Sequence, residues 1–352
     1  MDLNINYENL VQLILKKELR LKTLIELLNI DIDEVENELA TKAQRLGETF
    51  VRKGSEGIMI PKPVYTFRYA DCPESARLLH IAKVFSFAHE GSAYNSPDMS
   101  SYDLREDDAY RHVVVYDDGL FGVGLRFLPL YKGISYEKSS MNKLFMATET
   151  LQNDILGKAL ELGTTFIVPE LQGQPQSTNY LFSAMAFAIM LNRDAEILIG
   201  RPTIQGNMND DIKGLISSWM YETFHPKGQP DLVMYHENVP AIKLLPFSSY
   251  KDDYNSKVPE EERYNDAAPL RKREKAVERM VKKKGSEFPD IMAFYTIICA
   301  SEDGLVLFGP PVKNYGDYGP GSWEFPLGVK RNKIATIHTM YLDDANRQLY
   351  GK

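Results

Sequence analysis

Three polar side chains in the middle of the chain are of the types that transfer protons to, or pair with, a substrate. Glu161 stands near the start of one apolar stretch, Arg126 near the end of another, and Asp103 within a polar segment. A carboxylate such as Glu161 can take the proton of a primary amine, directly or through a water, and so make the amine a nucleophile. Arg126 can pair with a substrate carboxylate or with Asp103. Structural roles are also open to them: a solvated strand edge, a salt bridge and a turn cap.

Residues that other reactions need are present without the required spacing. No two of the six histidines are spaced as metal ligands, so we expect no metal site. The serines between 91 and 108 lack the turn of a nucleophile elbow, which argues against serine hydrolysis. Cys72 and Cys299 are expected to be two reduced thiols.

The elements that must position these side chains alternate between strand and helix patterns. Asp117-Asp118-Gly119 predicts a hairpin turn. Apolar patterns predict strands at 64–69, 111–116, 120–128, 160–168, 197–199, 293–299, 305–308 and 334–340. They predict helices at 73–90, 142–156, 177–191, 210–224 and 270–284. We interpret 53–63 as a linker and 248–268 as a loop. The order predicts one α/β domain over 64–352.

Residues 1–50 form a separate pattern of helices and tight turns, with the last helix at about 35–46. The pattern loosely resembles a helix-turn-helix. Glu34, Glu36 and Glu38 place acid where a DNA-recognition helix needs base, so an interaction or packing module is favoured.

Several motifs follow one another in an order that is typical of one enzyme superfamily. They are Tyr102-Asp103, the strand from Val113 to Asp117, the strand Gly122-Val123-Gly124-Leu125-Arg126-Phe127-Leu128-Pro129, the block from Glu161 to Glu170, and Leu198-Ile199-Gly200 with Thr203 and Ile204. Over about 64–245 this order resembles the GNAT superfamily of N-acyltransferases, nearest to acyl-homoserine-lactone synthases and ornithine-lipid N-acyltransferases.

The resemblance implies a GNAT-like mixed, mostly antiparallel sheet flanked by helices, with a small all-α N-terminal unit. It implies an N-acyltransferase that moves a long acyl chain from acyl carrier protein to the amine of an amino acid or similar small molecule. Glu161, Arg126 and Asp103 would be catalytic. The fourth and fifth strands, at 160–168 and 197–204, would splay apart to admit the pantetheine arm. The donor would lie along Phe166, Ile167 and Val168, with its phosphate at Gln172, Gly173, Gln174 and Ser177, the last as the N-cap of the next helix.

Two features depart from the family pattern. Thr164 stands where the family has Arg, and the phosphate loop from Gln172 to Ser177 has one glycine and a proline. Fewer free backbone N–H groups weaken the case for coenzyme A and favour carrier-protein phosphopantetheine, with no permanently bound cofactor. The alternatives are an N-acetyltransferase that uses acetyl-CoA, or a non-catalytic GNAT-fold regulatory or scaffold protein. Thr164 and the loop favour the non-catalytic reading, and Glu161 and Arg126 oppose it.

The net charge of −8 argues against nucleic acid as the main partner of the 352-residue chain. The concentrated positive patch is the helix from Arg271 to Lys284, with Lys251 and Lys257 just before it. It could dock an acidic carrier protein, rest on anionic lipid, or be a solvated face. No signal peptide is visible, and the longest apolar run, 181–191, is too short to span a bilayer. We therefore expect a cytoplasmic protein, with peripheral contact at the inner membrane face left open.

Overall fold

The computed structural model describes residues 19–53, 58–89, 109–239, 241–299, 301–314 and 321–351. Its contacts divide the chain into two compact units. Unit 1 comprises 1–129, 160–195 and 338–352, and unit 2 comprises 130–159 and 196–337. Asp103 and the polar segment around it lie outside the described residues.

Unit 1 is built on an antiparallel sheet in which each strand pairs with the next. The strands, in sheet order, are β1 (Gln44–Lys53), β2 (Ile58–Phe67), β3 (Arg111–Asp117), β4 (Leu120–Leu128) and β6 (Ala159–Ile167). The predicted hairpin between β3 and β4 is confirmed. Asp118 and Gly119 both have positive φ, 48° and 82°, as the tight turn of a twisted hairpin requires.

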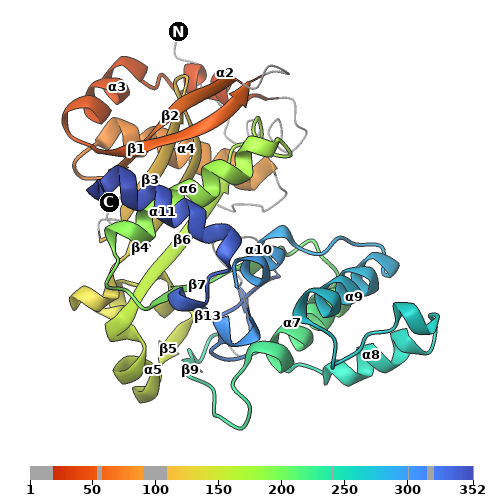
Figure 1. Ribbon diagram of the computed structural model, residues 1–352. Coiled ribbons are helices and arrows are strands. Elements are labelled where there is room, and N and C mark those ends of the chain that lie inside the picture. The colour runs from red at the N-terminus through yellow and green to blue at the C-terminus, as the bar shows by residue number, and fades with distance from the viewer. Residues whose placement is uncertain are drawn as a thin grey trace. The chain divides into compact units, whose positions relative to one another are not determined.

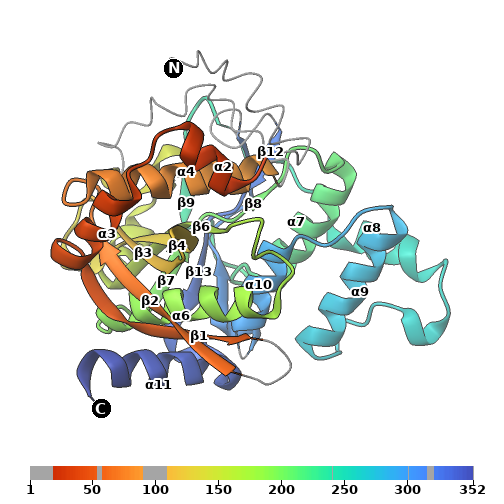
Figure 2. The same ribbon diagram turned by 90° about the horizontal axis from the view of Figure 1, so that it is seen from above.

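Helices cover both faces of this sheet, as Figures 1 and 2 show. On one face lie α2 (Leu21–Leu27), α3 (Ile32–Thr41) and α4 (Pro73–His89), and on the other lie α6 (Pro175–Leu191) and α11 (Thr336–Tyr350). Buried apolar residues of α2, α3 and α4 share one core with strand residues such as Phe67, Val114 and Phe166. The first helices are thus packed on the sheet that carries the predicted site.

In the described part of unit 2 the strands form three antiparallel groups. β13 (Leu327–Lys330) lies between β7 (Ile197–Gly200) and β10 (Leu305–Leu307), and β12 (Ser322–Glu324) lies between β8 (Thr203–Ile204) and β11 (Val312–Asn314). The third group pairs β5 (Phe145–Ala147) with β9 (Val233–Tyr235). The helices are α5 (Glu149–Asp154), α7 (Asp210–Phe224), α8 (Phe247–Asn255), α9 (Leu270–Lys283) and α10 (Asp290–Ile298). The expected α/β class with mostly antiparallel strands flanked by helices is confirmed.

Three expectations in the first half of the chain were wrong. The helix expected to reach 46 ends at Thr41, and Gln44 begins β1, so the N-terminal segment is not all helical. The expected linker contains the first half of β2. Pro61 and Pro63 are tolerated there because only residues 64–67 of β2 also pair with β3. The helix expected at 142–156 is interrupted by β5.

Near the C-terminus, three other expectations were wrong. Strands were expected at 293–299 and 334–340, but residues 293–298 belong to helix α10 and residues 336–340 to helix α11. Part of the expected loop at 248–268 is helix α8. Short apolar runs such as Ala293–Cys299 fit a strand and a buried helix equally well, and here the packing decides.

Candidate functional site

Strand β6 places the predicted carboxylate inside unit 1. Glu161 is 1% exposed and lies directly opposite Leu128 of β4. This burial excludes the solvated strand edge that the sequence left open. A carboxylate held away from water is costly unless it is bonded, so this position is one where a carboxylate needs partners inside the protein.

Arg126 lies on the same sheet face as Glu161. It is opposite Gly163 of β6, two residues from Glu161, and opposite His112 of β3 on its other side. Residues opposite each other, or two apart on one strand, share a face, so Arg126 and Glu161 are diagonal neighbours. The Arg126 guanidinium lies 4.3 Å above the ring of Tyr110. This cation–π contact orients the arginine on a rigid, buried aromatic surface.

The ladder between β4 and β6 is interrupted three residues after Glu161. Gly124 is opposite Phe166 and Arg126 is opposite Gly163, so Thr164 and Thr165 together face the single residue Leu125. Thr164 has a φ of +47°, a left-handed conformation that is a clear outlier for a β-branched residue. Such a bulge disrupts the ladder locally, and bulges are frequent beside active sites.

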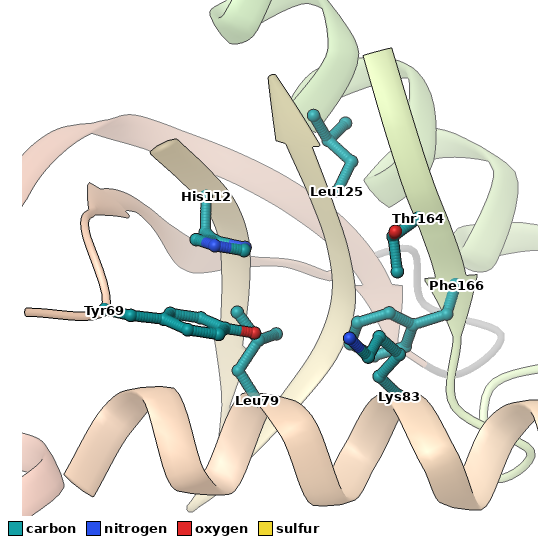
Figure 3. Close-up of a pocket in the computed structure, with 7 residues that line it drawn as sticks. All are labelled: Tyr69, Leu79, Lys83, His112, Leu125, Thr164 and Phe166. Carbon is teal, nitrogen blue, oxygen red and sulfur yellow. The ribbon is translucent and has the colours of Figure 1, made fainter. Parts of the chain in front are cut away.

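A small cavity lies beside this bulge, between β6 and α4. Its lining includes Tyr69, Lys83, His112, Thr164 and Phe166, with Leu79 and Leu125 completing it. In Figure 3 the His112 ring stacks on Tyr69 and the Lys83 side chain extends from α4 toward Phe166. The two stacked rings are 4.0 Å apart and tilted by only 8°. The cavity volume is about 10 Å³, which is enough for roughly one water molecule.

Sequence reasoning missed Tyr69, Lys83 and His112. All three are almost fully buried, and Lys83 lies within a mostly apolar helical segment, between Ile81-Ala82 and Val84-Phe85. A lysine and a histidine inside apolar patterns were the available signals. Arg111 precedes His112 in β3. Burial lowers the pKa of its guanidinium, and the positive charge of Arg68 adds to this effect.

The predicted donor-binding residues lie together at the end of β6 and the turn that follows. The backbone N–H of Val168 donates to the Gly122 carbonyl at 3.0 Å, and the side-chain amide of Gln172 donates to the Ile167 carbonyl at 2.9 Å. The N–H groups of Leu171, Gln172 and Gln174 are also bonded within the turn. Gly173 is exposed, with a φ of +72°. The turn is therefore largely closed on itself.

The N-cap of α6 is Gln174, followed by Pro175 in the first turn, so the assignment of Ser177 as N-cap was wrong. The Ser177 hydroxyl donates to the Gln174 carbonyl at 2.6 Å from inside the helix. The N–H at the first helical position has no acceptor within the helix, so a proline, which lacks this N–H, is favoured there. Pro175 therefore begins the helix three residues earlier than expected.

Within the described residues, no cluster of three His, Cys, Asp or Glu side chains is placed to hold a metal ion. Within the same residues, no helix is long and apolar enough to cross a membrane. The strands expected to splay apart belong to different units, and their divergence stays a prediction.

Comparisons with known proteins add little to this geometry. No protein-family model matches the sequence, and no curated protein matches it. One solved structure, an acetoin utilization protein from Exiguobacterium sibiricum 255-15, is 12% identical over 88% of this chain and 98% of that chain, with a TM-score of 0.24. A likeness of that extent carries no argument about this protein.

Proposed function

We propose that this protein is a GNAT-type N-acyltransferase that moves an acyl group from a thioester to the amine of an amino acid or similar small molecule. The proposal rests on two neighbouring features of strand β6. Within four residues this strand holds a buried carboxylate, Glu161, and the left-handed break at Thr164. A proton acceptor next to an interrupted row of backbone N–H groups is what acyl transfer to an amine requires.

In the proposed reaction the amine nitrogen attacks the thioester carbonyl carbon. The nitrogen's proton passes to Glu161, directly or through a water, and the carbonyl oxygen becomes an oxyanion. Collapse of this intermediate breaks the carbon–sulfur bond, and the leaving thiolate takes up a proton. Backbone N–H groups near the bulge would stabilise the oxyanion, because they are fixed before the reaction begins.

Arg126 is proposed to bind the carboxylate of the acceptor. It shares a sheet face with Glu161, and its guanidinium is held over Tyr110. An arginine oriented in this way can form a bidentate pair with a carboxylate and so place the neighbouring amine near the base. The role proposed for Asp103 comes from the sequence alone.

The turn from Val168 to Gln174 favours carrier-protein phosphopantetheine over coenzyme A as the carrier of the acyl group. Several backbone N–H groups of this turn already bond within it. A pyrophosphate would need more free donors than a single phosphodiester at the start of α6. Acyl-CoA remains the second donor to test.

The proposal is tested by incubating the protein with acylated carrier protein and a panel of amino acids, with thiol release followed by colour and products by mass. Each amino acid is paired with its decarboxylated amine. We expect the rate of thiol release to depend on the amine. In an Arg126→Met variant, the KM for the amino acid should rise roughly 10–100-fold, while the KM for the decarboxylated amine should not change. Thiol release at the buffer rate with every amine and with both acyl donors would contradict the proposal.

A further inference from the structure

The basic residues in and around helix α9 of unit 2 divide into two groups. One group is used inside the unit: each member forms an ion pair with a nearby acid. These pairs are Arg271–Glu274, Arg273–Glu302, Lys283–Glu262, Lys284–Asp211, Lys251–Asp266 and Lys257–Asp253. These bases are thus balanced by the acids that they contact and add little net positive field.

The second group is Lys272, Lys275, Arg279 and Lys282, here named the α9 stripe. The four side chains are all exposed, and their spacings of 3, 4 and 3 place them on one face of the helix. The stripe is about 15 Å long at 1.5 Å per residue. Within the described residues, its three lysines form no ion pair, and Arg279 donates to the backbone carbonyl of Glu262 at 3.3 Å.

Glu278 lies beside the α9 stripe, three residues after Lys275 and four before Lys282, and is half-buried. Burial, followed by the neighbouring Glu274, raises its pKa. One acid thus lies beside four bases. The opposite face of the helix is apolar and packed inside unit 2, through Ala276, Val277, Met280 and Val281. A helix that lies in a membrane surface needs its apolar face for the lipid, and in α9 that face is already used.

We propose that the α9 stripe binds an acidic helix of the acyl carrier protein. An acidic helix whose carboxylates recur once per turn matches four basic side chains that also recur about once per turn. The protein's net charge is −8, so the stripe gives an acidic partner a local attraction on a chain that is acidic as a whole. The inference rests on the proposed function for the identity of the partner.

The test measures binding directly, so that it does not depend on turnover. Carrier protein with a fluorescent pantetheine is titrated with wild type, with Lys272→Glu/Lys275→Glu/Lys282→Glu, and with a matched control. The control, Lys132→Glu/Lys138→Glu/Lys227→Glu, changes three exposed lysines of unit 2 and the net charge equally. We expect the stripe variant to raise Kd at least tenfold at low salt and the control to change it less than threefold. The wild-type advantage should shrink as salt rises, because exposed charges are screened over about 10 Å at 0.1 M.

Equal weakening by the two variants would overturn the inference, because net charge and not the stripe would then act. Absence of carrier-protein binding by the wild type would also overturn it, as would stripe-dependent binding to vesicles of phosphatidylglycerol without carrier-protein binding. Stripe-dependent carrier binding without thiol release would support the inference and count against the proposed acyl transfer. A small acyl-pantetheine thioester should be used equally well by wild type and stripe variant.

Discussion

Arg126 and Glu161 lie on one face of the unit 1 sheet as diagonal neighbours on adjacent strands, with Gly163 directly opposite Arg126. The same face carries α4, since a Cβ at Gly124 would lie 2.9 Å from a methyl carbon of Leu79. The proposed base and the proposed carboxylate-binding arginine therefore share the sheet face on which α4 packs.

Thr164 is expected to be strained, because its φ of +47° disfavours a β-branched side chain. Thr164→Gly should therefore leave the free energy of unfolding unchanged or raise it by about 1 kcal/mol, as measured by urea denaturation. The neighbouring Thr165→Gly, where no positive φ occurs, should lower it by about 0.5–1 kcal/mol. Equal destabilisation by both changes would show that the left-handed bulge is not formed.

Glu38 of α3 is expected to hold the start of α4. Its buried carboxylate accepts from the N–H groups of Ser75 at 2.8 Å and Glu74 at 3.3 Å, in the first turn of that helix. Helix N-termini favour negative charge. Glu38→Gln should lower the free energy of unfolding by about 1–3 kcal/mol. The exposed control Glu26→Gln should change it by less than about 0.5 kcal/mol, and a similar small effect at Glu38 would refute this capping role.

Burial raises the pKa of the Cys72 thiol to about 11 from its ordinary 9.0, with Glu38 and Asp71 adding to the effect. The folded protein therefore keeps this proton at pH values where the unfolded chain has lost it. The contribution of this thiol to the free energy of unfolding is complete below pH 9 and is lost as the pH rises toward 11. The free energy of unfolding falls by at most about 1.4 kcal/mol per pH unit on this account. Urea midpoints across pH 8–11 should fall less steeply in Cys72→Ala than in wild type. Parallel curves would mean that the thiol titrates normally in the folded state.

Sequence patterns located elements best where the period or the turn chemistry was unambiguous. The Asp118-Gly119 turn and the helix from Asp210 to Phe224 were found at their true positions. Residues 293–298 were assigned to the wrong class because a short apolar run does not distinguish a strand from a helix. The start of β1 was missed because Leu46 continues the helical spacing of Val35 and Leu39, while pairing with β2 overrides that local preference.

For the candidate site, the sequence predicted roles for Glu161 and Arg126, and the pairing of β4 with β6 brings the two residues to one sheet face. Their roles stay predictions. Gly163 was the available signal for a break in β6, because an isolated glycine in a strand pattern suggests a bulge. The left-handed residue itself could not be foreseen, because it is the neighbouring Thr164 and a threonine rarely adopts a positive φ. His112 and Lys83 looked like interior residues of a strand and a helix. Their approach to Tyr69 and Phe166 depends on the packing of α4 against the sheet, which no local pattern encodes.

The central claim is that Glu161 takes the amine proton during acyl transfer. The most direct measurement is the rate of thiol release at saturating amine for wild type and Glu161→Gln, with circular dichroism to confirm that both are folded. The amide keeps the shape of the side chain and removes the base, so the rate should fall roughly 10²–10⁴-fold. A variant rate equal to that of wild type would contradict the claim, because the proton would then leave through another group or through solvent.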